Sequence, residues 1–138
     1  MTALRQILGT IAASVTAGGI YATFHVVADS ADAVMWPATF AIATPVALLH
    51  ALVLGLPAAW SLRRRGKLTL LNVLVAAFAI GAVPAPTAAI LAMPSETPFP
   101  TAAAIIMVCG TLGLIGGGVW WIVSGASSNY ALERTQEG

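Results

Sequence analysis

The charged residues of this chain gather in five short clusters, and long apolar intervals separate the clusters. Each of the four intervals is longer than the roughly 20 apolar residues that cross a bilayer at 1.5 Å per residue. The pattern therefore predicts an all-α membrane protein with four transmembrane helices. The clusters are Arg5; Asp29 and Asp32; Arg63, Arg64, Arg65 and Lys67; Glu96; and Glu133, Arg134 and Glu137.

The composition argues against a soluble domain. Of the 138 residues, 59% are hydrophobic and 8% are charged, whereas soluble domains carry about 25% charged residues. Four spans leave only short loops and tails, so no separate catalytic domain is expected. The net charge of +1 does not provide the broad basic surface that nucleic acids require, and we expect no nucleic acid partner.

We expect one integral membrane domain over 1–138, folded as an antiparallel four-helix bundle with short loops. The alternative for the first helix is a signal peptide, since Arg5 and the apolar residues after it imitate one that is cleaved near Ala17. The apolar run continues to Ala28, however, which favours a retained span. The predicted spans are 6–28, 38–62, 68–92 and 102–124, followed by a cytoplasmic tail at 125–138.

Four spans place both termini on the same side of the membrane as the 63–67 loop, so all six basic residues share that side. Basic residues next to spans remain in the cytoplasm during insertion. We therefore expect cytoplasmic termini, and the Ala-, Gly- and Leu-rich composition favours the bacterial cytoplasmic (inner) membrane. The loop residues act as topology anchors, or alternatively recognise anionic lipid headgroups; they are Arg63, Arg64, Arg65 and Lys67.

Tryptophans fall near the predicted ends of the spans. Trp60, Trp120 and Trp121 lie near the cytoplasmic ends, and Trp36 lies near the opposite boundary. Because indole rings favour the headgroup region, with the N–H toward water, all four are expected to anchor the protein there.

Small residues recur at intervals of four in every predicted span and should form grooves where helices approach closely. The groove of Gly113 and Gly117 could serve a second copy of the chain, which leaves a homo-oligomer open. The other interpretation is that all grooves are used within one chain. The residues expected to pack helices are Gly18, Ala47, Ala51, Gly55, Gly81, Gly113 and Gly117.

No Asp, Glu, Lys or Arg lies within a predicted span. Proton-coupled transporters usually keep such a residue in the membrane, so its absence counts against that class. His50 lies near mid-span and is either a functional group or a neutral imidazole bonded to a neighbouring helix. His25 is expected to be interfacial. No cluster of metal ligands is apparent, and neither a metal nor a cofactor is expected.

Prolines mark the outer halves of the second and third spans. Each proline inside a helix frees carbonyl groups, and helices broken at one depth can form a binding site. The other interpretation is ordinary kinking. A site at this depth would include the lone cysteine, which has no disulfide partner in the chain. The candidate pocket comprises His50, Tyr21, Thr44, Pro84, Pro86, Thr87 and Cys109.

Two classes of function remain. The first is a non-enzymatic accessory or partner-binding protein, immunity proteins included, that binds a membrane protein through helix–helix packing in the bilayer. The alternative is a small oligomeric channel or transporter, with a pocket around His50 and the break at Pro84 and Pro86. An enzyme is not expected, since no Ser or Cys nucleophile is spaced with a His and an acid.

Overall fold

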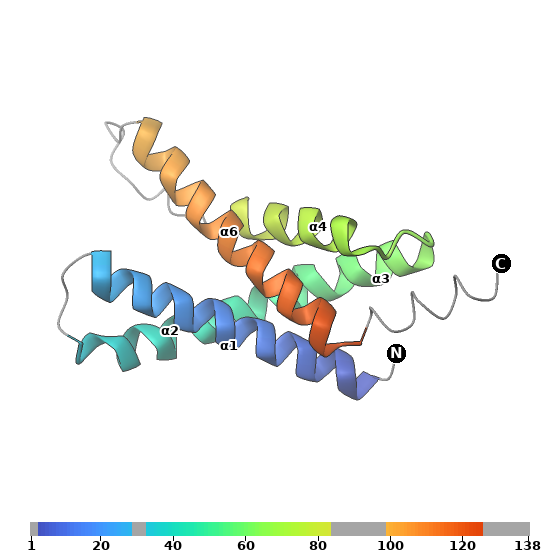
Figure 1. Cartoon of the computed structure of the whole chain (residues 1–138), viewed down its shortest axis with the longest axis horizontal. Coiled ribbons are helices and arrows are strands. Elements are labelled where there is room, and N and C mark those ends of the chain that lie inside the picture. Colours follow the sequence, from blue (N-terminus) through green and yellow to red (C-terminus); the bar gives the residue numbers. More distant parts are fainter. Residues whose placement is uncertain (1–2, 29–32, 84–98, 126–138) are drawn as a thin grey trace.

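The computed structural model describes residues 3–28, 33–83 and 99–125, and this part of the chain is helical with short turns (Figure 1). Because α2, η1 and α3 follow one another without interruption, the described elements form four rods, as the charge pattern predicts. The elements are α1 (Ala3–Ala28), α2 (Met35–His50), the π-helix η1 (Ala51–Gly55), α3 (Leu56–Arg64), α4 (Leu70–Ala82) and α6 (Phe99–Val123).

Three of these rods are long and apolar enough to cross a membrane: Ala3–Val27, Met35–Arg64 and Thr101–Val123. The fourth, α4, has 13 described residues and is shorter than a span. Its predicted continuation through 84–92 lies outside the described residues. The prediction of apolar helices of membrane-spanning length is thus confirmed for three of the four.

The turn between α3 and α4 follows from local chemistry. Gly66 has a φ of +63°, a conformation that glycine adopts without steric cost. This lets the Lys67 N–H donate to the Leu62 carbonyl at 2.9 Å, the six-residue closure of a Schellman motif. The next helix begins at Leu70, after the N-cap residue Thr69, whose hydroxyl accepts from the Asn72 N–H at 3.2 Å. The basic loop therefore combines a C-terminal and an N-terminal helix cap.

The prolines of the second rod change the backbone hydrogen-bond pattern without ending the helix. Pro45 lies inside α2, and Pro57 is the second residue of α3, two residues after the π-helix. Proline has no N–H and its ring crowds the carbonyl one turn earlier, here that of Val53. In η1 the Leu56 N–H instead reaches the Ala51 carbonyl five residues back. This wider turn accommodates the missing N–H of Pro57 and the crowded Val53 carbonyl, so the rod continues to Arg64.

Glycines allow α4 and α6 to touch at the backbone. A Cβ atom on Gly81 would collide with the Cys109 carbonyl oxygen, and one on Gly113 would collide with the Ala77 carbonyl oxygen. Each of these Cβ positions also lies 3.2 Å from the Cα atom of the opposite glycine. A Cα–H bond of each glycine occupies this direction. Gly81 and Gly113 therefore each make a weak Cα–H···O contact with a carbonyl oxygen of the other helix.

Two further close approaches join α1 to its neighbours. A Cβ on Gly18 would collide with the Thr44 hydroxyl of α2, and one on Gly9 would lie 3.2 Å from Trp120 Cδ1 of α6. A Cβ on Gly117 would lie only 2.5 Å from the Ala77 Cβ atom of α4. The groove of Gly113 and Gly117 is therefore filled by α4 of the same chain.

Trp120 and Trp121 lie in the core, only 9% and 7% exposed, where they pack with Ala13 and Val73. Their expected position as surface anchors is wrong, because Gly9 leaves room for an indole ring between α1 and α6. Trp60 by contrast is 57% exposed. The guanidinium carbon of Arg64 lies 3.7 Å from the centre of the Trp60 ring, a cation–π contact at the end of α3.

The glycines predict opposite responses to alanine. Gly81→Ala or Gly113→Ala should lower the free energy of unfolding by about 1–3 kcal/mol, because the new methyl group overlaps a backbone oxygen. Gly55→Ala should raise it by about 0.5–1 kcal/mol, because alanine favours the helix and the added Cβ would meet only Ala51 Cβ at 3.9 Å. Unfolding of the three purified variants in detergent micelles measures both effects. A loss of stability in Gly55→Ala equal to that in Gly81→Ala would contradict this packing.

Candidate functional site: a cavity between the helices

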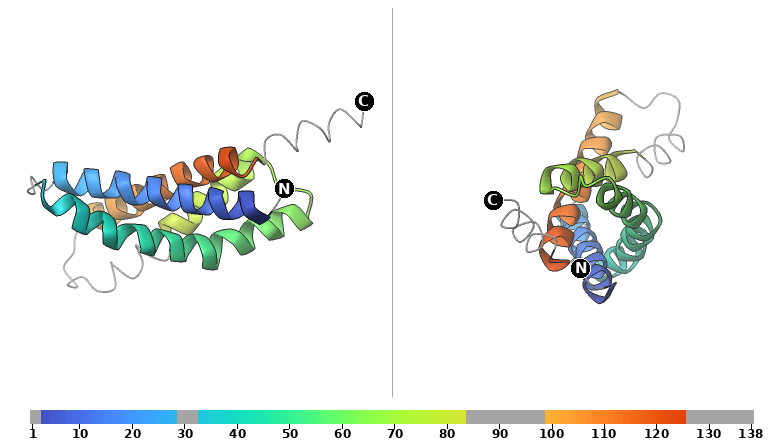
Figure 2. Two further views of the ribbon diagram at one scale, coloured as in Figure 1. Left: turned by 90° about the horizontal axis from the view of Figure 1, so that it is seen from below. Right: turned by 90° about the vertical axis from the view of Figure 1, so that its right-hand side faces the viewer.

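A cavity of about 1000 Å³ lies between the helices, and residues from α1, α2, η1, α3, α4 and α6 line it. The end-on view in Figure 2 shows these elements arranged around a common axis. A volume of this size is at the upper end of the range for pockets that bind drug-sized molecules. The cavity is therefore the leading candidate for a binding site.

One stripe of small residues forms much of the wall. It runs the length of the second rod at intervals of four residues, which places it on one face. The bulky side chains of the same rod, such as Leu49 and Val53, lie on the outer surface instead, 61% and 58% exposed. The stripe thus opens space where it was expected to bring two helices into contact. Its members are Ala43, Ala47, Ala51, Gly55 and Ala59.

Among the described residues that line the cavity there is no Asp, Glu, Lys or Arg. Of its hydroxyl groups, that of Thr10 donates to the Gln6 carbonyl and that of Ser14 to the Thr10 carbonyl, both at 2.9 Å. Tyr21 and His25 stack with ring centroids 6.4 Å apart and an interplanar angle of 11°. The wall is consequently apolar, with a few polar groups and no group that carries a permanent charge.

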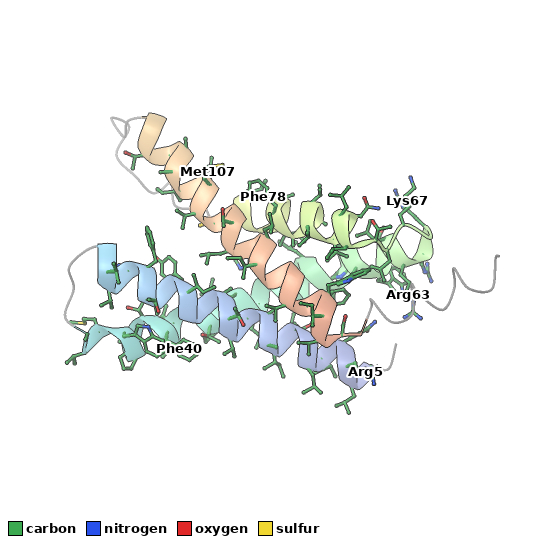
Figure 3. The ribbon with its side chains drawn as sticks, viewed as in Figure 1. Arg5, Phe40, Arg63, Lys67, Phe78 and Met107 are labelled. Atoms are coloured by element: carbon green, nitrogen blue, oxygen red, sulfur yellow. The ribbon has the colours of Figure 1, made fainter. Side chains whose placement is uncertain are left out.

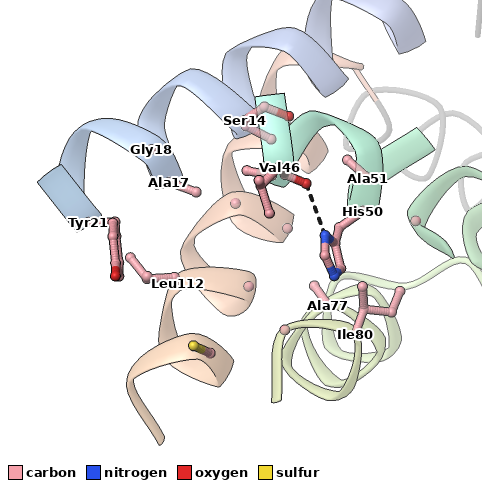
Figure 4. A pocket seen from close by; sticks show the side chains of 18 of the residues that line it. Ser14, Ala17, Gly18, Tyr21, Val46, His50, Ala51, Ala77, Ile80 and Leu112 are labelled. Carbon is pink, nitrogen blue, oxygen red and sulfur yellow. Dashed lines mark hydrogen bonds between the residues drawn. The ribbon is translucent and has the colours of Figure 1, made fainter. Parts of the chain in front are cut away.

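His50 supplies the polar group at the junction of α2 and the π-helix. Its Nδ1 atom lies 2.9 Å from the Val46 carbonyl oxygen. Because a carbonyl can only accept, Nδ1 must carry the proton, and in the neutral ring Nε2 then has a free lone pair. Figure 4 shows the ring extending from α2 toward Ala77 and Ile80 of α4. No hydrogen bond to Nε2 is formed within the described part of the chain.

The structure brings three of the seven predicted pocket residues to the cavity: Tyr21, His50 and Cys109. Thr44 lies elsewhere, in the contact with Gly18, and its hydroxyl has no hydrogen-bond partner among the described residues. Pro84, Pro86 and Thr87 lie outside the described residues. Of the predicted packing residues, Gly18, Gly81, Gly113 and Gly117 contact other helices closely, whereas Ala47, Ala51 and Gly55 line the cavity.

Sequence reasoning missed two features of the site. His25, expected at the interface only, also lines the cavity. The stripe of the second rod was interpreted as a packing face. It is longer than the small-residue runs of the other spans and contains no bulky residue, which could have indicated a cavity wall. Whether such a stripe contacts another helix or lines a cavity, however, depends on where the neighbouring helices lie.

Basic side chains gather away from the cavity lining, at one end of the molecule. Figure 3 shows Arg5, Arg63 and Lys67 at the same end, near the α3–α4 turn. None of these residues lines the cavity. Among residues 3–28, 33–83 and 99–125, no three His, Cys, Asp or Glu side chains come together in a way that could hold a metal ion.

No protein family, curated protein or solved structure matches this chain. The geometry of the cavity and its lining residues therefore carry the functional argument alone.

The bond to Val46 predicts the tautomer of His50. The neutral ring should carry its proton on Nδ1, whereas free imidazoles in water favour Nε2. Nitrogen NMR of histidine-labelled protein in micelles distinguishes the two forms, and His50→Gln identifies the signal by removing it, since the chain has two histidines. A dominant Nε2–H signal for His50 would show that the Val46 bond does not form.

Proposed function

We propose that this chain is an integral membrane protein that crosses the bilayer four times as an antiparallel bundle and acts by binding another component of the membrane. The cavity is the observation that favours this function, because it is built from every described helix and is apolar throughout most of its wall. An apolar cavity inside an apolar helical protein suits a molecule or segment that already resides in the bilayer.

Two observations support the membrane setting, and a third supports the antiparallel order of the rods. Three rods are long and apolar enough to span, and large apolar side chains such as Ile42, Leu71 and Ile122 are 70–72% exposed. Such exposure is costly in water but not in lipid. In the pair α4 and α6, Gly81 lies close to Cys109 and Ala77 lies close to Gly113, so residue numbers fall on one helix as they rise on the other, which supports the antiparallel order that we propose.

The basic end supports the orientation. With Arg5 at the same end of the molecule as the α3–α4 turn (Figure 3), the basic side chains would face one leaflet, and such residues favour the cytoplasmic side. We therefore place the protein in the bacterial inner membrane with both termini in the cytoplasm. There the Arg63–Lys67 loop meets the headgroups, with the Arg64 guanidinium held over the Trp60 ring.

A non-enzymatic role fits the residues around the cavity. In the part of the wall that residues 3–28, 33–83 and 99–125 form, no carboxylate is present to orient His50 as a general base. His50 Nδ1 is bonded to a backbone carbonyl within its own helix. What the lining offers is shape, apolar surface and a few polar groups, among them the acceptor Nε2 of His50, which are properties of a binding site.

The second candidate is a small channel or transporter, and the π-helix next to His50 favours it. Single π turns occur often at functional sites, and a helix with a shifted bond register can switch back to α geometry. The uncharged wall argues against the passage of ions, because an ion would lose its hydration without a partner. We therefore rank this function second.

Topology can be tested with single cysteines in a Cys109→Ser background. A membrane-impermeant maleimide added to intact spheroplasts should label Ala33→Cys from outside, and should label Lys67→Cys only after permeabilisation. The reverse pattern would contradict the orientation. Labelling of both residues from the outside would contradict the spanning bundle itself.

The binding function predicts a co-purifying component. Protein extracted from native membranes with mild detergent should retain a lipid or a membrane protein, detected by native mass spectrometry and reduced by cavity-filling Ala51→Leu. The exposed Ala41→Leu is the matched control on the same rod. If the protein instead carries ions or dye into liposomes, and His50→Ala alters that flux, the transporter function replaces this proposal.

A further inference from the structure

We propose that the cavity binds one uncharged, largely apolar, elongated molecule that donates a hydrogen bond from a hydroxyl or N–H group to Nε2 of His50. This inference rests on the proposed binding function and specifies the chemistry of the ligand. It draws on the charge of the lining, the hydrogen bonding of His50 and the distribution of polar groups along the cavity.

The lining excludes a charged ligand. A charge moved out of water into an apolar site needs an opposite charge or several hydrogen bonds as compensation. The lining residues that the structure describes include no Asp, Glu, Lys or Arg, and two of their hydroxyl groups already donate within α1. A ligand that is neutral and mostly hydrocarbon meets no such cost.

His50 selects a donor. Its Nδ1 proton is committed to the Val46 carbonyl at 2.9 Å, so Nε2 of the neutral ring can only accept. A ligand hydroxyl or N–H would satisfy this lone pair, whereas an ether or carbonyl oxygen would face it as a second acceptor. In a wall made of alanine, glycine and aliphatic side chains, that difference in hydrogen bonding distinguishes otherwise similar molecules.

The polar groups lie at two separate depths, which favours an elongated ligand. Gly18 faces Thr44, and so Tyr21, three residues later on α1, lies level with about residue 41 of α2. His50 is nine residues beyond that point, or about 13 Å along the helix axis. Figure 4 shows Tyr21 beside Leu112, well away from His50. Between them the wall is formed mainly by small and apolar residues such as Ala17, Ala47 and Gly113.

A partner helix fits this space less well than a single chain-like molecule. A helix with side chains is about 10–12 Å wide, and every rod of the described chain contributes residues to the cavity wall. Near the basic end α4 contacts both η1 and α3, which closes that side. Entry of a helix would separate α4 from the second rod, whereas a hydrocarbon chain requires no such separation.

The test uses two probes, a conjugated-polyene fatty alcohol and its methyl ether, in which a methyl group replaces the hydroxyl proton and so removes the donor. Each is titrated into the purified full chain in micelles, and binding is followed by quenching of tryptophan fluorescence, since Trp120 lines the cavity. The alcohol should bind about 2–10-fold more tightly than the ether, the range for one hydrogen bond. His50→Leu should remove this preference, and His50→Gln, whose carbonyl can accept, should restore part of it.

Cavity filling locates the site. Ala51→Leu should weaken both probes severalfold, and the exposed Ala41→Leu on the same rod should bind as wild type. Gel filtration and helix content verify that each variant folds. If His50→Leu does not fold, the ratio of alcohol to ether affinity in the wild type still tests the donor requirement. The affinities of Ala51→Leu and Ala41→Leu still test the location of the site.

The outcomes separate the inference from the function on which it rests. Equal affinity for alcohol and ether overturns the donor requirement. Binding unaffected by Ala51→Leu overturns the cavity as the site. If neither probe binds but a membrane protein co-purifies, the inference fails while the proposed function stands. If neither probe binds and nothing co-purifies, both fail.

Discussion

The backbone contact between Gly81 and Gly113 is the constraint on which the arrangement of the helices depends. It places a Cα–H of each helix against a carbonyl oxygen of the other, and so fixes both the distance and the register of α4 and α6. Lipid tails are as apolar as leucine, so in the bilayer setting we propose, close packing and such polar backbone contacts must hold helices together. Gly9 against Trp120 and Gly18 against Thr44 extend the same principle to α1.

These contacts join the rods in the order α4, α6, α1 and α2, and leave the second rod with a different role. Its N-terminal half, α2, packs against α1, while η1 and α3 also reach α4. Its small stripe therefore faces the space that the other three rods enclose. The same type of residue, alanine or glycine at every fourth position, produces contact in α4 and α6 and a cavity wall in the second rod.

Much of the fold could be predicted from the sequence, because four apolar intervals between charge clusters leave few alternatives. The bounds of α1, of the second rod and of α6 follow the predicted spans to within a few residues. The positions of Trp120 and Trp121 could not be predicted, since a tryptophan near a helix end suits both a headgroup layer and a core. Gly9, far away in the sequence, decides between them by leaving space for the Trp120 ring.

The candidate site was predictable only in part, for a similar reason. The lone histidine at mid-span could be recognised from the sequence, and so could Tyr21 and Cys109 from their depth in the span. Depth does not determine which way a side chain points, however, because Thr44 faces Gly18 and not the cavity.

The π turn connects the sequence of the second rod to the chemistry of His50. Pro57 removes one backbone donor and crowds the turn before it. The backbone hydrogen bonds of the preceding segment form the wider turn from Ala51 to Gly55 instead. His50 stands at the first residue before that turn, with its ring bonded to Val46 in the regular helix behind it. A proline about two turns away thus places an acceptor lone pair beside the widened segment. The acceptor and the small residues next to it therefore arise from one local sequence, which explains why shape and hydrogen-bonding capacity coincide at this level of the cavity.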